Sequence, residues 1–470
     1  MVSDSARKLV IGYSIWPTGH HRLAWRLPEA FNRGTVDPVF LGDSIRTAER
    51  GLFDYFFIGN SVKSDPSSAR ASGNEVFKIE GYTLAGYAAA ITSRIGVVVT
   101  INSTYSDPYN TARAIVSLDH LTNGRAGLNI VTGITGSAAS SNFSKDSHAA
   151  TDDKYDWADE LVEVVHALSD SWESDWLVDD RERGIFLDPE KGHYIDHAGK
   201  HFSVRGPLNL PRPPQGHIPI IHAGTSERSF EFGAKYADIR FSPYRGPDWN
   251  RRYYTDVKDR LPAHGREKDD QFILPGFTFF VGGTSREAHA KYRQVQAFAE
   301  GEYIPKVVSD FVGLDLSRVS ESEKVLDVLD IDALRTEAAA APLDAQGNTQ
   351  AVANFSGNKL WAVELALEAY GDEDVTFRDL YHYIANFPGN QAPVVGSGPE
   401  IADWIEERFH DRQIDGVKVF PPYSKYPLDA FVDEVVPQLQ RKGIFRTSYE
   451  TTTLRGHLGL DTPENPYARR

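Results

Sequence analysis

Residues 117–137 read Ser-Leu-Asp-His-Leu-Thr-Asn-Gly-Arg-Ala-Gly-Leu-Asn-Ile-Val-Thr-Gly-Ile-Thr-Gly-Ser, and this stretch says most about the fold. The pair Asn123-Gly124 predicts the end of a helix, because both residues tolerate the left-handed backbone that terminates helices. An apolar strand over 128–132 follows, with Asn129 in its middle, and then a loop of small residues. In α/β proteins ligands bind at the carboxyl ends of the strands, which is where such a loop lies. Asn129 is therefore either a hydrogen-bonded core amide or a ligand-facing group.

The composition excludes several classes of protein. A chain of 470 residues, 41% of them hydrophobic, is suited to one α/β barrel domain over residues 1–470. Its formal charge of −16 argues against nucleic acid or an anionic membrane surface as a partner. The absence of cysteine excludes disulfides, thiolate metal sites and iron–sulfur clusters. The sequence shows neither an apolar run of membrane-spanning length nor a signal-peptide core, so we expect a cytoplasmic protein.

Eight short apolar runs alternate with helical patterns. The predicted strands are 9–15, 53–58, 95–102, 127–132, 218–222, 239–241, 272–280 and 416–420. Several are continuous apolar runs, which is typical of parallel strands covered on both faces. The predicted helices are 44–51, 82–92, 110–121, 152–169, 226–236, 285–300, 399–409 and 428–441. This alternation predicts a closed (β/α)8 TIM barrel; the alternative, an open doubly wound sheet, fits the length and strand count less well.

Two segments are longer than connections between barrel elements need to be. Residues 171–217 are rich in proline and aromatic residues, and residues 301–390 include an alanine run at 338–341 and the sequence Asn-Phe-Pro-Gly at 386–389. Long insertions in such barrels usually carry function, so we expect both segments to lie over the active face.

The predicted strand ends carry neutral hydrogen-bonding residues. They are Gly59-Asn60, Asn102-Ser103-Thr104, Thr132-Gly133, Ala223-Gly224-Thr225-Ser226 and Ser242-Pro243. Ligand groups of a barrel come from these ends, although ordinary turn chemistry also favours such residues. No pair of carboxylates stands at these ends, which argues against a glycosidase that uses two acids.

The segment His222–Arg228 predicts an anion site. A strand ends near Gly224 and a helix begins near Ser226, so free backbone amides and the hydroxyls of Thr225 and Ser226 would face a phosphate. An ordinary helix cap is the alternative interpretation. Tyr155, in the first turn of another predicted helix, either donates to the same phosphate or packs in the core.

Two further patterns favour other chemistry only weakly. His193, His197 and His201 are spaced four apart, which on a helix would form a metal site, but Gly199 and Pro207 argue against a helix there. Residues 396–398 read Gly-Ser-Gly and lack the third glycine of a dinucleotide-binding fingerprint, and a P-loop is absent. We therefore expect neither a metal site nor a nicotinamide site.

Many ordered motifs together resemble one family of enzymes. They are His20-His21 with Ala24-Trp25-Arg26, Phe53-Asp54, Thr104-Tyr105 with Pro108-Tyr109, Leu118-Asp119 with Gly124-Arg125, Asn129-Ile130-Val131-Thr132, Tyr155-Asp156 with Ala158-Asp159-Glu160, Val204-Arg205-Gly206-Pro207, Pro213-Pro214-Gln215-Gly216, Ala223-Gly224-Thr225-Ser226, and Arg446-Thr447 with 454–460. Across nearly the whole chain they resemble the nitrilotriacetate monooxygenase/pristinamycin synthase/dibenzothiophene-sulfone monooxygenase family of bacterial-luciferase-like flavin enzymes.

The resemblance implies a barrel that binds reduced FMN and O2 and inserts one oxygen atom into a small organic substrate through a flavin C4a-peroxide. Carried over by position, three side chains would line the flavin ring: Asn60, Thr104 and Asn129. Three others would hold the phosphate: Tyr155, Thr225 and Ser226. Near the end of the first strand, His20 or His21 is expected to hydrogen-bond the peroxide or exchange a proton with it. The resemblance implies that the site contains no metal ion.

Partners follow from the same resemblance. Because the chain lacks a nicotinamide fingerprint, we expect a separate NAD(P)H:FMN reductase to supply FMNH2 by diffusion. Symmetric assemblies are usual in this superfamily, so a homodimer or homotetramer is expected. Aromatic residues such as Tyr105, Phe241 and Tyr244 suggest a flat or apolar substrate, and carbon–sulfur, carbon–nitrogen and carbon–halogen cleavage all stay open.

The chain also departs from its relatives. Asn60 stands where an acid is common, Leu128 replaces a usual Trp, Gly133 a usual Ser and Ser229 a usual Gly. Three other functions remain as alternatives: a deazaflavin-dependent oxidoreductase on the same barrel, a flavin-binding protein without turnover, and a metal-dependent hydrolase.

Overall fold

The computed structural model describes residues 7–21, 23–62, 77–132, 141–144, 151–299, 305–306, 308–309, 314–340, 360, 363–364, 366–367, 374–385, 393–424 and 426–468. The small-residue loop at 133–137, with the Gly133 substitution, lies outside these residues. So do residues 341–359 and the 386–389 sequence of the second predicted insertion.

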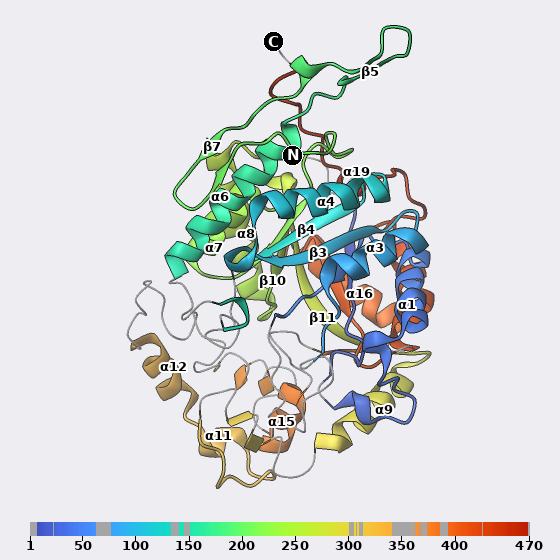
Figure 1. Ribbon diagram of the computed structural model, residues 1–470. Coiled ribbons are helices and arrows are strands. Elements are labelled where there is room, and N and C mark those ends of the chain that lie inside the picture. Colours follow the sequence, from blue (N-terminus) through green and yellow to red (C-terminus); the bar gives the residue numbers. More distant parts are fainter. Residues whose placement is uncertain are drawn as a thin grey trace.

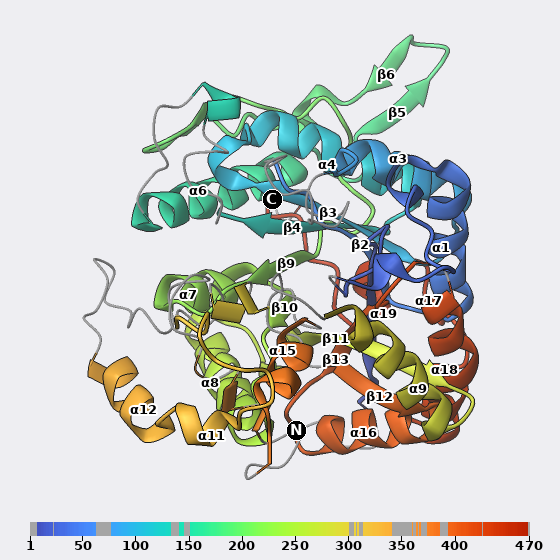
Figure 2. The ribbon, with the colours of Figure 1, turned by 90° about the horizontal axis from the view of Figure 1, so that it is seen from below.

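Eight parallel strands close into a barrel, which confirms the predicted fold (Figures 1 and 2). They are β1 (Val10–Ser14), β2 (Tyr55–Ile58), β3 (Gly96–Asn102), β4 (Ala126–Val131), β9 (Ile220–Ala223), β10 (Ile239–Ser242), β11 (Phe272–Gly282) and β13 (Gly416–Phe420). Pairing of β1 with β13 and of β10 with β11 closes the ring. Each predicted strand coincides with one of the eight.

A ninth strand, β12 (Pro393–Ser397), was not predicted. It pairs with the outer half of β11, from Thr278 to Gly282, whereas β13 pairs with β11 from Gly276 to Thr278. The strand is only five residues long and contains a proline and a glycine, so its sequence resembles a loop. Its pairing depends on β11 being longer than the other barrel strands.

Helices cover the outside of the barrel. They include α1 (Pro38–Arg50), α3 (Gly81–Ile91), α4 (Pro108–Thr122), α6 (Thr151–Asp170), α7 (Glu227–Tyr236), α8 (Pro247–Arg260), α9 (Ser285–Gln296), α16 (Gly398–His410), α17 (Tyr426–Ala430) and α18 (Val436–Arg441). Helix α4 ends as predicted, with Asn123 in the left-handed conformation at φ 55°. Helix α8 was not predicted, because its many charged residues obscure a buried side formed by Tyr253, Tyr254 and Val257.

The predicted long runs of apolar residues are explained by burial on both faces of each strand. In β3, Val97 and Val99 lie in the core between strands and helices, whereas Val98 faces the barrel interior with Tyr55 and Ile221. Both groups are inaccessible to solvent, so the strand does not need polar residues at alternate positions.

A short helix near the C-terminus, α19 (Leu454–His457), closes the amino end of the barrel. Leu454 is fully buried among interior side chains of the strands. A Cβ atom on Gly96 or Gly127 would lie 2.7 or 2.9 Å from its methyl groups, so these two glycines make room for it.

We expect Leu454→Ala to lower the free energy of unfolding by about 3 kcal/mol, because it leaves a cavity in a closely packed barrel end. Chemical denaturation of the purified chain measures this. Leu121→Ala is the matched control, since Leu121 is 72% exposed on α4 and its truncation should change stability by less than about 0.5 kcal/mol. Equal effects at both positions would contradict the proposed closure.

The segment 171–217 starts where α6 has returned to the amino ends of the strands. Its first hairpin, β5 (Leu177–Asp180) and β6 (Ile185–Leu187), extends beyond that end (Figure 1). The second, β7 (His197–Ala198) and β8 (Ser203–Val204), runs along α6, where Glu160 accepts hydrogen bonds from the backbone N–H groups of His201 and Phe202. The turn between β7 and β8 approaches the carboxyl ends, where His201 and Phe202 adjoin Thr104. The expectation that the segment 171–217 lies over the active face is therefore wrong for the β5–β6 hairpin.

The described part of 301–390 lies at the other end of the barrel from the β5–β6 hairpin (Figure 1). It contains α11 (Val325–Val328), α12 (Ile331–Ala340) and α15 (Phe377–Ala385), around a small apolar core of its own. Among the helices that the structure describes, none has the length and apolar character needed to cross a membrane.

Candidate functional site

The six residues predicted to hold a flavin lie along one side of the barrel. Asn60 follows β2, Thr104 follows β3, Asn129 lies in β4, and Thr225 with Ser226 follows β9; these four strands are consecutive neighbours in the sheet. Tyr155 comes from α6, which connects β4 to β9. The structure therefore brings the six positions to one continuous arc at the carboxyl ends.

Two of these six residues, Asn129 and Thr104, are buried and hydrogen-bonded to neighbouring segments. Asn129 is buried, and its Nδ2 donates to Thr100 Oγ1 at 3.1 Å. Thr104 is also buried; its Oγ1 donates to the carbonyl of Thr132 at 2.9 Å. Asn60 is partly exposed beside the start of α3. Asn129 is thus hydrogen-bonded, as its core interpretation required, yet it lies in the arc that a ligand would use.

The sequence predicts an anion site at the start of α7, and we call Gly224–Ser226, the first turn of α7 and Tyr155 the cradle. Ser226 is its N-cap residue and accepts a hydrogen bond from Ser229 N at 3.3 Å. Gly224, at φ +136°, adopts a backbone that other residues rarely adopt. A Cβ there would lie 2.4 Å from Ser229 Oγ and 3.5 Å from the hydroxyl of Tyr155. The Tyr155 hydroxyl, the Gly224 backbone and the start of α7 are therefore close together, which is the arrangement that an anion site at a helix start requires.

A buried hydrogen-bond network of Arg240 and His222 supports the cradle. The guanidinium of Arg240 is almost fully buried and donates to the carbonyls of Gly224 and Ser229 and to Ser229 Oγ. His222 Nδ1 donates to the carbonyl of Ile130 at 2.8 Å, so its Nε2 accepts from the Ser229 hydroxyl at 3.0 Å. Burial, and then the charge of Arg240, lower the pKa of His222 to about 3 and keep it neutral. The serine that replaces a usual glycine is thus part of the support.

His20 and His21 follow β1, which lies across the barrel from β9 and its cradle. The surroundings of the two histidines differ. Nδ1 of His21 accepts a hydrogen bond from Leu23 N at 3.0 Å, which gives that ring a structural role. Both ring nitrogens of His20 are buried and have no hydrogen-bond partner among the described residues. The ring of His20 lies 3.9 Å from that of Phe420 on β13. Of the two histidines, His20 is the one left available to a ligand.

Electrostatics keep His20 uncharged. Burial, followed by the nearby Lys78 and Lys418, lowers the pKa of His20 well below 6.5. A neutral imidazole can donate through one nitrogen and accept through the other, as a group that exchanges protons requires.

A pocket of about 340 Å³ opens at the carboxyl end of β3. Thr104 lines it together with Tyr105, whose ring stacks on Phe143 at 4.5 Å. Trp157 and His201 contribute from α6 and from the β7–β8 turn. Thr104 belongs both to this pocket and to the arc of six residues predicted to hold a flavin. The pocket also has the aromatic lining that was expected from Tyr105.

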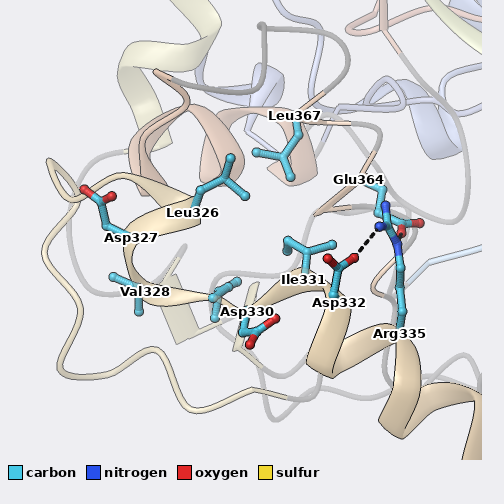
Figure 3. A pocket seen from close by; sticks show the side chains of 10 residues that line it. Leu326, Asp327, Val328, Asp330, Ile331, Asp332, Arg335, Glu364 and Leu367 are labelled. Carbon is cyan, nitrogen blue, oxygen red and sulfur yellow. Dashed lines mark hydrogen bonds and ion pairs between the residues drawn. The ribbon is translucent and has the colours of Figure 1, made fainter.

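The larger pocket, of about 630 Å³, lies on the second insertion between α11 and α12 (Figure 3). Arg335 donates to both Asp332 and Glu364, whereas the other two acids of the lining, Asp327 and Asp330, leave the pocket with an excess of negative charge. Since these residues belong to neither the barrel mouth nor the cradle, we do not assign the catalytic site to this pocket.

One expectation and one alternative that the sequence already disfavoured are not supported. Tyr244 does not line the mouth, because its hydroxyl donates to Gln413 at 2.8 Å and its ring packs on Phe277 and Trp404. The spaced histidines do not converge on a metal: His193 contacts Glu173 and His197 contacts Glu160, and the described residues contain no group of three potential ligands.

Sequence reasoning missed two buried cations. Arg240 supports the cradle, and Lys418 lies in the middle of β13. The signal was present in the sequence, because each is a charged residue inside an apolar strand and therefore needs a structural or functional reason to be there.

A closed parallel barrel with polar residues at the carboxyl ends of its strands defines the class of α/β-barrel enzymes, which bind their ligands at that face. The family model for luciferase-like monooxygenases matches residues 23–415, and the chain belongs to this family.

Similar proteins extend over the whole chain. N-acetyl-S-(2-succino)cysteine monooxygenase of Bacillus subtilis (strain 168) is 34% identical over 100% of both chains. Nitrilotriacetate monooxygenase component A of Aminobacter aminovorans is 34% identical over 98% of this chain and 99% of its own. A crystal structure of riboflavin lyase with modified FMN and its substrate riboflavin superposes with a TM-score of 0.78 at 26% identity, covering 97% of each chain. These similarities confirm the resemblance drawn from the sequence motifs.

Proposed function

We propose that this monooxygenase is the oxygenase component of a two-component system that uses FMNH2 and O2 to insert one oxygen atom into a small organic substrate. The observation that carries the proposal is the space between Gly224, the start of α7 and the Tyr155 hydroxyl. A hydroxyl and the start of a helix, both of which can donate to the phosphate of FMN, come together there, and the polar arc from Asn60 to Asn129 continues along the neighbouring strands.

In this proposal Tyr155, Thr225 and Ser226 hold the phosphate, and Asn60, Thr104 and Asn129 line the ring. Reduced FMN would supply the electrons with which O2 is activated. The protein fixes the ring, excludes water and presents the substrate. The second insertion, at the end of the barrel opposite the β5–β6 hairpin, is suited to that exclusion.

His20 is the residue we assign to proton exchange beside the reacting atoms, because its ring is buried, neutral and without a partner among the described residues. It lies near β1, across the barrel from the cradle at β9, so it approaches the ring end of the flavin rather than its phosphate. His21, whose Nδ1 accepts from Leu23 N, positions this loop.

The proposal includes a partner. Nitrilotriacetate monooxygenase component A carries a name that implies a second component, and this chain lacks a dinucleotide fingerprint. We propose an NAD(P)H:FMN reductase that delivers FMNH2 by diffusion. A homodimer or homotetramer in the cytoplasm remains the prediction for assembly and location.

The test combines the purified chain with FMN, NADH, a generic flavin reductase and a panel of small sulfur-, nitrogen- and halogen-bearing compounds. We expect O2 uptake and a product heavier by one oxygen atom, read by mass spectrometry under 18O2. Incorporation of label only when both reductase and chain are present supports the proposal. Turnover with a deazaflavin and without O2 would replace it with the deazaflavin alternative, and FMN binding without any product would leave a non-catalytic flavin protein.

Gly224→Ala should weaken FMN binding about 10- to 30-fold. The new Cβ forces strain at φ +136° and fills the space beside the Tyr155 hydroxyl. Quenching of flavin fluorescence during titration measures the Kd. The control is Gly265→Ala, at φ +71° with no atom within 4 Å of the new Cβ, which also replaces a glycine of positive φ, away from the site, and should leave the Kd unchanged. Unaltered FMN affinity in Gly224→Ala would place the phosphate elsewhere.

A further inference from the structure

Lys418 is a buried amine in the barrel interior. It lies in the middle of β13, only 3% exposed. Its neighbours in register are Gly12 on β1 and Gly276 on β11, two residues without side chains. The long side chain of Lys418 therefore extends across the barrel instead of meeting a residue beside it.

Aromatic rings surround the amine. Lys418 Nζ lies 3.0 Å from the ring centroid of Phe57 on β2, 4.7 Å from that of Phe241 on β10 and 5.6 Å from that of Phe420. Ring faces attract a cation, but they do not replace the hydrogen bonds that water gives to an ammonium group. Burial therefore lowers the pKa of Lys418 well below 10.5.

Lys418 also lacks the partner that a buried lysine normally has. In the parts of the chain that the structure describes, no carboxylate pairs with it, and burial is the sole cause of its lowered pKa. The contrast is Lys258, equally buried at the amino end, whose Nζ lies 3.0 Å from Asp415. An amine without an acid in a folded barrel calls for an explanation other than stability.

Two unpartnered polar groups lie on the same wall. Thr278 on β11 is fully buried, and its hydroxyl has no hydrogen-bond partner among the described residues. It pairs in register with Phe420, whose ring contacts His20, and both nitrogens of His20 are also without a partner there. Buried polar groups are almost always hydrogen-bonded, so this wall is built to meet a ligand.

The titratable neighbours of the amine are bases or neutral. His20 comes from the loop after β1, and Lys78 comes from the segment before α3. Tyr55, on β2, lies over Gly12, and burial raises the pKa of its hydroxyl, so it stays neutral. Strands β10 and β11 present Phe241, Gly276 and Thr278 to this space. No acid of these elements competes for the amine.

We propose that Lys418 is the charge-recognition group of the barrel mouth, the opening at the carboxyl ends of the strands. When an anionic group of a ligand arrives, the Lys418 amine takes one proton from solvent and pairs with that group. His20 and Thr278 hydrogen-bond to the same ligand. The step forms one N–H bond at Nζ, breaks no bond of the ligand and moves no electrons between them. The anionic group is either a carboxylate of the substrate or the negatively charged ring of reduced FMN. The inference rests on the proposed function, because that function brings both ligands to the mouth.

Calorimetric titration at pH 8, in two buffers of different ionisation enthalpy, counts the protons taken up on binding. One arm compares reduced FMN under argon with oxidised FMN, whose ring is neutral. The other arm, with oxidised FMN present, compares succinate and benzoate with succinamide and benzamide. We expect the wild-type chain to take up about one proton with the charged member of at least one arm and none with its neutral counterpart. The arm that responds identifies the source of the anion.

The variant Lys418→Met keeps the shape of the side chain and removes the amine. We expect loss of the proton uptake and about 10- to 100-fold weaker binding of the charged ligand. Because the unpaired amine is removed from an apolar site, the ligand-free variant should melt about 2 °C or more above wild type. Lys442→Met, at a surface ion pair with Asp403 and Glu406, is the matched control and should retain the uptake.

Three outcomes overturn the inference: no uptake with any charged probe, uptake that persists in Lys418→Met but disappears in His20→Gln, or a lowered melting temperature of Lys418→Met. Each can occur while oxidised FMN still binds and labelled product still forms, in which case the proposed function stands. Failure of FMN to bind the wild-type chain would instead remove the proposed function.

Discussion

Replacing His20 with glutamine is expected to lower kcat about 100-fold or more while the Kd of FMN stays within about twofold. The glutamine amide can still hydrogen-bond, but it cannot exchange a proton near neutral pH. FMN affinity should persist because the phosphate cradle follows β9, which lies across the barrel from β1. The effect therefore separates a role in the reaction from a role in binding.

The measurement is steady-state turnover with the reductase and a substrate from the panel. The rate at which O2 re-oxidises the bound reduced FMN gives a second, substrate-free readout. His410→Gln is the matched control, since the His410 side chain is 48% exposed on α16 and should not alter either rate. Normal turnover in His20→Gln, with its melting temperature unchanged, would assign the proton exchange to another group.

Arg240→Met is expected to lower the free energy of unfolding by about 3 kcal/mol and to weaken FMN binding by more than about tenfold. Methionine fills most of the volume, but the carbonyls of Gly224 and Ser229 lose their buried donor. The loop of the cradle is then no longer held against α7. The fixed positive charge beneath the helix start, which favours a phosphate, is lost as well.

Chemical denaturation and flavin titration check the two effects. Arg181→Met is the control, because the Arg181 side chain is 88% exposed in the β5–β6 segment and exposed ion pairs contribute little. If Arg240→Met bound FMN like the wild type but unfolded more easily, the arginine would serve the fold and not the cradle. If neither the free energy of unfolding nor the Kd of FMN changed, the hydrogen bonds of Arg240 would contribute neither to stability nor to FMN binding.

Much of the barrel could be predicted from the sequence because its signals are local. Asn123 tolerates the left-handed backbone that ends α4, and the apolar runs of β3 and β4 reflect burial on both faces. The start of α7 was predicted correctly for the same reason, since a serine cap is written in the few residues around Ser226. The strand β12 and the helix α8 lacked such local signals.

The predicted site residues lie together at the carboxyl end of the barrel because parallel strands all deliver their carboxyl ends to one face. That rule placed Asn60, Thr104 and Thr225 on the face without any knowledge of side-chain contacts. It could not distinguish His20 from His21, since the difference depends on a hydrogen bond from Leu23 and on a ring of Phe420 far along the chain.

The sequence by itself determined the order of strands and helices, the family, and the polar character of the strand ends, because these depend on residue types and short spacings. Only the tertiary structure decided which polar groups are already satisfied and which are not. Ser229 and Arg240 are held by hydrogen bonds, whereas among the described residues His20 is buried without a hydrogen-bond partner and Lys418 without a carboxylate. The reason is physical: burial and pairing are set by strands that meet across the barrel, and β13 meets β1 only when more than 400 residues have folded between them.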